Sequence, residues 1–270
     1  MACISAIVTT LNEEAQIGDC LGRLAFADEV IVVDSFSTDR TTAIASALGA
    51  RVLQHAYHSP ASQKNWAVEQ ASGDWVIIVD ADELVTEELA AEIRQVASSP
   101  NAHDGYRIRR RNFFLGHEIR HSGWQNDRVV RLFRRGRGSH PKRQIHEQVV
   151  LEGSVGDLKG TLLHYSYRSL DDYWRKLQRY AEWNAAEARC QGARVSPLYM
   201  MVHPPLRFWK AYLLQGGFRD GVPGLVVCLL TAIYAAAKDI RIWEQQAAGD
   251  REQRPAPAES GPYARDRGAE

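Results

Sequence analysis

The sequence is poor in cysteine and lacks the cysteine spacing of metal-binding and redox motifs. Its four cysteines, Cys3, Cys20, Cys190 and Cys228, lie far apart and form no CxxC pair. This pattern disfavours a disulfide framework and a zinc site of the usual kinds. A reducing, cytoplasmic setting fits this cysteine usage best.

Two further signals are missing near the amino terminus. The opening MACISAIVTTLNEE lacks a basic region, a long apolar stretch and a small-residue cleavage site, so we expect no secretory signal and an intracellular protein. No glycine-rich phosphate loop follows the first apolar run. That absence, together with the acidic cluster at 12–14, counts against a nucleotidyltransferase, which would bind a triphosphate there.

The charge has no net sign, but it is unevenly distributed. Residues 1–100 hold 15 acidic and 5 basic side chains, whereas residues 105–143 hold 2 acidic and 12 basic ones. A basic stretch of this kind suits an anionic partner. Charge alone leaves open a diphosphate, a phosphorylated glycolipid or nucleic acid.

The first hundred residues alternate between short apolar runs and segments with helical spacing. This alternation predicts a parallel sheet flanked by helices. The strands are expected at 4–10, 29–34, 51–54 and 75–79, and the helices at 17–24, 41–48, 61–70 and 87–96.

Polar and acidic residues follow the ends of these strands. Ligands of open parallel sheets bind beyond the carboxyl ends of the strands, so these side chains should gather there. Asp80 and Asp82, two residues apart at a strand end, project to the same side and can share one Mg²⁺ or Mn²⁺. The alternative for this pair is an acidic cap before the next helix.

The rest of the chain predicts further units. Basic and aromatic segments from Gly105 to Tyr165 predict a second, more antiparallel sheet region, and 169–189 predicts an amphipathic helix.

Residues 203–243 mix aromatic and basic residues with an uncharged run of 16 residues, 222–237. Because a bilayer crossing needs roughly 20 such residues, we expect an interfacial or re-entrant helix pair, with a buried carboxy-terminal helix as the alternative. A disordered tail is expected over 249–270.

Several motifs in order resemble glycosyltransferase family 2. These are TLNEE after the first strand, VVDSFSTDRT after the second, then SQKNWAVEQASGDW and DADE, and the resemblance covers roughly residues 4–165. It implies an α/β fold of the GT-A type, a Rossmann-like mixed sheet flanked by helices. We therefore expect a GT-A domain at 1–168, with a donor-binding half to about residue 100 and an acceptor half after it. A helical membrane-associating extension at 169–248 would follow.

The same resemblance implies roles for individual residues. Asp34 would accept a hydrogen bond from the base, and because the imide N–H of uracil suits a carboxylate, uridine is the preferred nucleoside. Asp80 would touch ribose or metal, Asp82 would coordinate the metal, and Lys64 would lie near the donor. The remaining residues expected to line the nucleotide sugar are Thr9, Leu11, Asn12, Glu13 and Ala81.

An inverting transferase also needs a carboxylate that removes the proton of the acceptor hydroxyl. Glu147, in KRQIHEQVV, stands where GT-A enzymes carry their base motif, and Asp127 in GWQNDR is the second candidate. The alternative for Glu147 is an ion pair with one of the many nearby basic residues, such as Lys142 or Arg143.

Two more residues enter through the resemblance. His164, in LLHYSY, resembles the metal-facing histidine of this fold and would complete a shell of aspartate, histidine and diphosphate. Trp124 would offer its face to the donor sugar. From the residues alone, a hydrogen-bonded core histidine is the preferred interpretation of His164, and a core side chain is the alternative for Trp124.

Within the family, WQNDRVVRLFRR, IHE and LKGTLLHYSYRS look like the bacterial lipopolysaccharide inner-core β-1,4-glucosyltransferases. This implies glucose transfer from UDP-glucose to a heptose of a lipid-linked core, by a peripheral enzyme on the inner face of the cytoplasmic membrane. Other branches of the family use other donors and acceptors. A non-catalytic nucleotide- or nucleic-acid-binding protein remains the alternative, although no RNA-stacking signature is present and we expect no nucleic-acid partner.

The assignment of the base leads to a direct test. Glu147→Gln removes the proton acceptor and leaves the donor site untouched, so turnover should be lost while UDP still binds. Asp82→Asn should abolish turnover through loss of the metal ligand. Initial rates and UDP titrations of both variants check this, and near-normal rates for Glu147→Gln would mean that another residue is the base.

Overall fold

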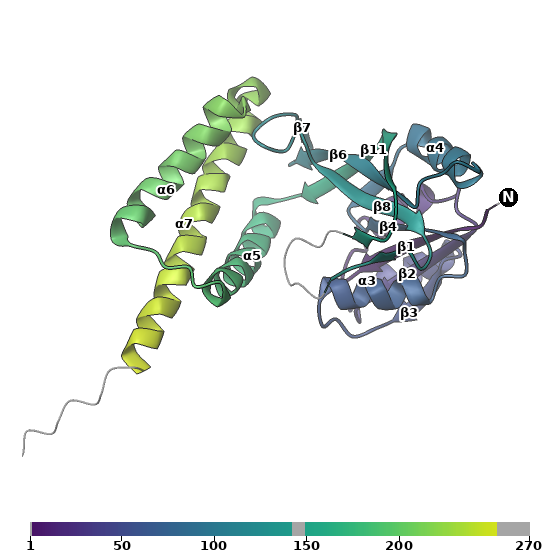
Figure 1. Ribbon diagram of the computed structural model, residues 1–270, viewed down its shortest axis with the longest axis horizontal. Helices are drawn as coiled ribbons and strands as arrows, with labels where there is room; N and C mark the ends of the chain where they lie inside the picture. The colour runs from purple at the N-terminus through teal and green to yellow at the C-terminus, as the bar shows by residue number, and fades with distance from the viewer. Residues whose placement is uncertain (1, 142–148, 253–270) are drawn as a thin grey trace, which may run out of the picture.

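The computed structural model describes residues 2–141 and 149–252 (Figure 1). The chain forms a sheet with flanking helices, and an arm of helices that extends away from the sheet. The expected alternation of strands and helices in the first hundred residues is confirmed. Its elements are β1 (Ile4–Thr10), α1 (Ile17–Gly22), β2 (Glu29–Asp34), α2 (Thr41–Ala47), β3 (Arg51–Gln54), α3 (Pro60–Glu69), β4 (Trp75–Asp80), β5 (Glu83–Val85) and α4 (Glu87–Ala97).

The four long amino-terminal strands are parallel, in the spatial order β3-β2-β1-β4. β1 and β4 are almost continuously buried, and β4 is apolar up to Asp80, as strands covered on both faces should be. Two buried clusters cover the two faces: one packs the sheet on α1, α2 and α4, and the other packs it on α3. α3 and α4 begin where the side chains of Ser59 and Thr86 cap them.

The second half of the domain continues the same sheet, which corrects the expectation of a separate sheet region. β8 pairs antiparallel with β4, and β6 lies between β8 and β11, so the order is β3-β2-β1-β4-β8-β6-β11-β5. β8 lies between β4 and β6, and its consecutive residues Arg131, Leu132 and Phe133 are all buried, as in a strand covered on both faces. These elements are β6 (Gly105–Phe114), β7 (His117–Ile119), β8 (Arg128–Arg134), β9 (Gly138–Ser139), β10 (Val150–Leu151) and β11 (Val155–Tyr167). The fold is thus the mixed sheet flanked by helices that the sequence predicts.

The arm contains the helices that follow β11. These are α5 (Leu170–Cys190), α6 (Pro197–Trp209), a π-helical turn η1 (Lys210–Leu214), a 3₁₀ turn η2 (Gly217–Asp220) and α7 (Gly221–Glu252). Figure 1 shows α6 and α7 side by side, with α5 closer to the sheet. α7 continues to Glu252, so residues 249–252 of the expected disordered tail are helical, and the rest of that expected tail, 253–270, lies outside the described residues.

The apolar run of the sequence is part of a longer helical segment than expected. Within the described residues, Gly217–Ala247 is 31 residues long and apolar enough to cross a membrane by length and composition. A buried helix of a soluble protein can pass the same test, but only 28% of the apolar window is buried. The helix is therefore poorly covered by the rest of the chain.

Candidate active site

The parallel register brings the predicted polar residues to one edge of the sheet. Thr9 in β1 lies beside Asp80 in β4, and Thr10 lies beside Asp34 in β2. Ala81 is buried directly after β4. The edge therefore combines a polar loop after each of three adjacent strands, which is where an open α/β sheet binds its ligand.

The loop after β1 has a fixed shape. Asn12 adopts a left-handed backbone (φ 56°), its amide oxygen accepts the Thr38 N–H at 2.8 Å, and its own N–H donates to the Ser37 hydroxyl at 2.8 Å. Asp34 is fully buried and accepts hydrogen bonds from the backbone N–H and the hydroxyl of Ser37. Leu11 is exposed beside them. The contact expected between Asp34 and a base stays a prediction, and it would have to share a carboxylate already bonded to Ser37.

Asp80 lies in a buried cluster of charges. Lys64 Nζ is 3.1 Å from its Oδ1, and the Arg131 guanidinium contacts its other oxygen and also Glu83 Oε1 at 2.6 Å. Burial alone would raise the pKa of Asp80, but Arg131 and Lys64 hold it well below the ordinary carboxyl value. Asp80 is therefore ionised and oriented by two cations.

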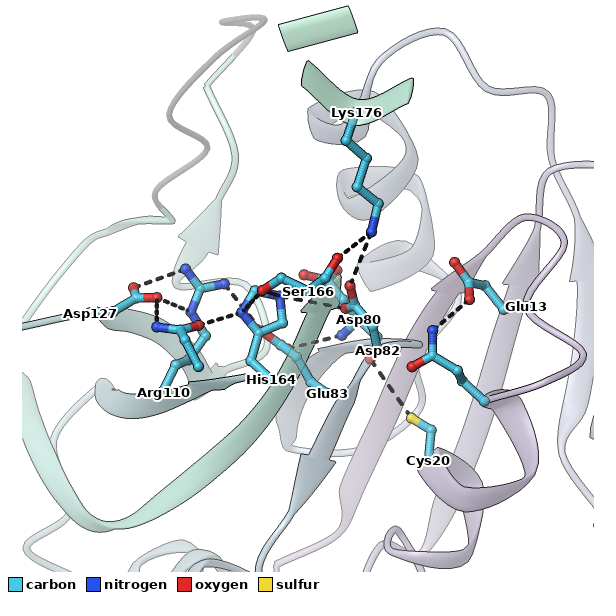
Figure 2. Close-up of polar contacts among 12 residues, drawn as sticks. Glu13, Cys20, Asp80, Asp82, Glu83, Arg110, Asp127, His164, Ser166 and Lys176 are labelled. Atoms are coloured by element: carbon cyan, nitrogen blue, oxygen red, sulfur yellow. Dashed lines mark hydrogen bonds and ion pairs between the residues drawn. The ribbon is translucent and has the colours of Figure 1, made fainter. Parts of the chain in front are cut away.

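Asp82 faces a different set of groups, as Figure 2 shows. Its Oδ1 is 3.7 Å from His164 Nε2, and its Oδ2 is 3.9 Å from the ammonium of Lys176, which reaches the site from α5. Burial acts to raise the pKa of Asp82, yet these two neighbours keep it below its ordinary value. Glu13 lies on the other side of Asp82, and burial raises the pKa of the Glu13 carboxyl.

Hydrogen bonds define the tautomer of His164. Asp127 accepts two hydrogen bonds from Arg110, both at 2.9 Å, and a third from the amide nitrogen of Asn112 at 2.9 Å. Because a carboxylate can only accept, the amide oxygen of Asn112 must face His164 Nδ1, which is 2.7 Å away. Nδ1 therefore carries a hydrogen, and in the neutral ring the lone pair of Nε2 is left to point toward Asp82.

The pair Asp82 and His164 fits one divalent cation. Two ligand bonds of about 2.1 Å each can span up to about 4.2 Å, and the two ligand atoms are 3.7 Å apart. Among residues 2–141 and 149–252 no group of three or more His, Cys, Asp or Glu side chains could hold a metal. A bound ion would therefore need further ligands from beyond the described side chains, such as water or a substrate.

The remaining predicted residues lie farther out. Trp124 packs against Tyr167 in the apolar cluster between the sheet and the arm, 6.3 Å between ring centroids. Asp127 is tied to Arg110 and Asn112, and although its burial acts to raise the pKa, these partners lower it. This weakens Asp127 as a proton acceptor. Glu147 lies outside the described residues, so its role stays a prediction.

Sequence reasoning missed four residues of the cluster: Glu83, Asn112, Arg131 and Lys176. Glu83 directly follows the predicted acidic pair and could have been included on its position alone. Arg131 sits in RVVRLFRR among several arginines, and nothing in the sequence separates it from its exposed neighbours. Lys176 lies on a helix outside the predicted catalytic domain, where no motif marks it.

Comparison with known proteins agrees with this architecture. The model of the family described as "Glycosyl transferase family 2" matches residues 5–161, more than half of the chain. The chain belongs to glycosyl transferase family 2, as the motifs of the first hundred residues predict.

Individual relatives span nearly the whole chain. A "Lipopolysaccharide core biosynthesis glycosyltransferase LpsC" of Rhizobium meliloti is 30% identical over 251 residues, which cover 90% of this chain and 93% of the relative. An uncharacterized glycosyltransferase of Rickettsia typhi is also 30% identical, covering 90% and 86%. Among solved structures, S. aureus TarS 1–349 in complex with UDP has 19% identity and a TM-score of 0.48, covering 93% of this chain and 92% of that one.

The buried ion cluster predicts a pH-dependent stability. Arg131→Met should lower the free energy of unfolding by about 3–5 kcal/mol at pH 7, because Asp80 and Glu83 lose their shared cation. Arg128→Met in the same strand breaks only an exposed pair with Asp157 and should cost about 0–1 kcal/mol.

The sign of the pH effect follows from the lowered pKa of Asp80. Its contribution to stability is complete above the ordinary carboxyl pKa and is lost as the pH falls below it. The difference between wild type and Arg131→Met should therefore shrink on acidification. Urea denaturation between pH 7 and pH 3 measures this, and a difference that grew in acid would contradict the assignment.

Proposed function

We propose that this protein is an inverting, metal-dependent glycosyltransferase that moves a sugar from a UDP-sugar to a lipid-linked saccharide. The proposed donor is UDP-glucose, and the sugar transferred is glucose. The observation that carries the proposal is the facing pair of Asp82 and the His164 Nε2 lone pair at the carboxyl edge of the sheet. In a chain of this family, such a pair at the ligand-binding edge of the sheet is an argument for a site that binds a cation and the diphosphate of a nucleotide sugar.

Asp82 and His164 would hold Mg²⁺ or Mn²⁺, which neutralises charge on the departing diphosphate when bound. Asn112 keeps the His164 lone pair directed at the ion site, and Asp127 and Arg110 keep Asn112 in place. Lys176 adds a second positive charge beside Asp82. A cation fixed in advance where negative charge develops lowers the barrier without reorganisation.

The donor nucleotide would lie over Thr9, Leu11, Asn12 and Glu13, with Asp34 toward the base. Lys64 and Asp80 would border the ribose and the diphosphate. Glu147 would accept the proton of the attacking hydroxyl, since Asp127 is already committed to Arg110 and Asn112. Trp124 would contribute to the acceptor side rather than to the donor sugar, because it packs beneath the arm.

The name of the Rhizobium relative supports a lipopolysaccharide core acceptor, such as the inner-core heptose. The ion pairs in the basic stretch argue against a nucleic-acid binder. Arg107 pairs with Asp157, Arg110 with Asp127, and Arg111 with Glu118. Much of the positive charge is thus neutralised within the protein.

The donor and metal can be tested together by thermal shift. UDP-glucose with Mn²⁺ should raise the melting temperature, and EDTA should remove the effect, because only the folded protein binds the pair. Asn112→Leu should weaken Mn²⁺ binding about 10–100-fold by releasing His164. Asn65→Leu, which changes a buried contact with the backbone of His140, serves as a control for general loss of packing. A UDP-glucose response that is insensitive to EDTA would refute the metal assignment.

The arm supports binding to the inner face of the cytoplasmic membrane. α6 has no buried residue, and large apolar side chains are exposed along α6, η1 and the start of α7. The most exposed of these are Leu198, Met201, Leu214 and Val222, each more than 70% accessible. Basic side chains beside this surface suit anionic headgroups, as in Arg207, Lys210 and Arg219.

Vesicle flotation tests this surface. The protein should float with phosphatidylglycerol vesicles, and Leu214→Glu should reduce the bound fraction several-fold, because a charge would replace a side chain that is 83% exposed at the end of the arm. Leu48→Glu, at a 55% exposed apolar residue of the sheet domain, should bind like wild type. Equal binding of the two variants would place the membrane contact elsewhere.

A further inference from the structure

A cavity of about 300 Å³ lies where the arm meets the sheet. Its walls come from the ends of β6 and β11, the loop that carries Trp124, and the helices α5 and α7. The volume is at the lower end of the roughly 300–1,000 Å³ of small-molecule sites, so it suits a group of about one ring. Residues far apart in the sequence build it together.

The cavity begins one side chain away from the ion site. Tyr167 forms part of its wall, and the ammonium of Lys176 lies over the Tyr167 ring, 5.4 Å from its centroid. The same ammonium is 3.9 Å from Asp82 Oδ2. A group bound in the cavity is thus adjacent to the place where Asp82 would act.

The lining combines aromatic faces with polar groups. Trp124, Tyr167, Tyr180 and Tyr234 all contribute to the walls, and the Asn184 side chain lies among them. Asn184 interacts with the Tyr234 hydroxyl. Tyr167, Tyr180 and Tyr234 bring three phenol rings to the one cavity, and burial raises the pKa of Tyr167 and of Tyr234.

This chemistry selects among occupants. An acyl chain would match the apolar side chains of the wall but would offer no hydrogen bond to the tyrosine hydroxyls or to the Asn184 amide. A charged group has no buried ion of opposite sign in the lining. A sugar ring satisfies both parts of the wall, because its C–H face packs on aromatic rings and its hydroxyls bond to the phenols and the amide.

We propose that this cavity binds a neutral sugar ring of the acceptor, and that it positions the neighbouring acceptor hydroxyl beside the ion site. The inference rests on the proposed function, since it names where that reaction takes its acceptor. It also gives the arm a second role, because the helices that face the membrane would build the site for a membrane-anchored saccharide.

The test uses the full-length protein and methyl α-D-mannopyranoside as the probe. Saturation-transfer NMR should show contact with the ring C–H protons, and the double change Tyr234→Phe and Asn184→Ala should reduce that signal at least several-fold. Tyr199→Phe, on the exposed side of α6, is the matched control and should behave as wild type. Equal signals in wild type, the double variant and the control would overturn the proposal, and so would the absence of a signal in wild type. Saturation transfer to sodium decanoate, an acyl chain, in place of the sugar would overturn it as well.

Kinetics separate this inference from the proposed function. Kinetics use heptose-terminated lipopolysaccharide as acceptor and the changes Tyr234→Phe and Asn184→Ala made one at a time. Each of these two variants should raise the acceptor KM about ten-fold, the equivalent of one hydrogen bond of about 1.4 kcal/mol. Hydrolysis of UDP-glucose in the absence of acceptor should be unchanged. An unchanged acceptor KM with normal hydrolysis would refute the cavity assignment alone, whereas absence of UDP-glucose hydrolysis and transfer in wild type would refute the proposed function.

Discussion

The buried guanidinium of Arg131 is the interaction on which the acidic edge of the sheet depends. Asp80 and Glu83 both bond to it, and Lys64 supplies a second cation to Asp80. Without these partners, carboxylates so close together and so well buried would repel one another or take up protons. Asp80 and Glu83 are neutralised inside the protein, whereas the Asp82 carboxylate has longer contacts, 3.7 Å to His164 and 3.9 Å to Lys176, and can act toward a ligand.

Because Arg131 lies in β8, the antiparallel strand beside β4 is part of the site as well as of the fold. The same division appears around Asp82: His164 comes from β11, Asn112 from β6, and Lys176 from the arm. The amino-terminal half thus supplies Asp80, Asp82 and Glu83, and apart from Lys64 the groups that orient and neutralise them come from the carboxy-terminal half.

The arm is bonded to the sheet domain at defined points. The backbone N–H and the ring Nδ1 of His121 both contact the Asp220 carboxylate at 2.8 Å, and the Tyr173 hydroxyl donates to the Leu230 carbonyl at 3.0 Å. These bonds hold the cavity walls together. A movement of the arm relative to the sheet domain would therefore displace Lys176 and the walls of the proposed acceptor site.

The sequence predicts the parallel half well, because the apolar runs and turn residues of 4–97 are local signals. It also predicts Asp80, Asp82, Lys64 and His164, which the structure brings to one cluster. It fails where pairing is long-range: β8 joins β4 only through packing between distant segments, and Glu83–Val85 is too short to be recognised as a strand. Arg131 and Lys176 cannot be distinguished from other basic residues until the fold places them beside carboxylates.

The most direct test of the central claim is a crystal structure of the protein with UDP and Mn²⁺. The account predicts that Asp82 and His164 Nε2 bind the ion together with the diphosphate, while Asp80 remains bonded to Arg131. An ion bound elsewhere, with Asp82 turned away from the nucleotide, would contradict it.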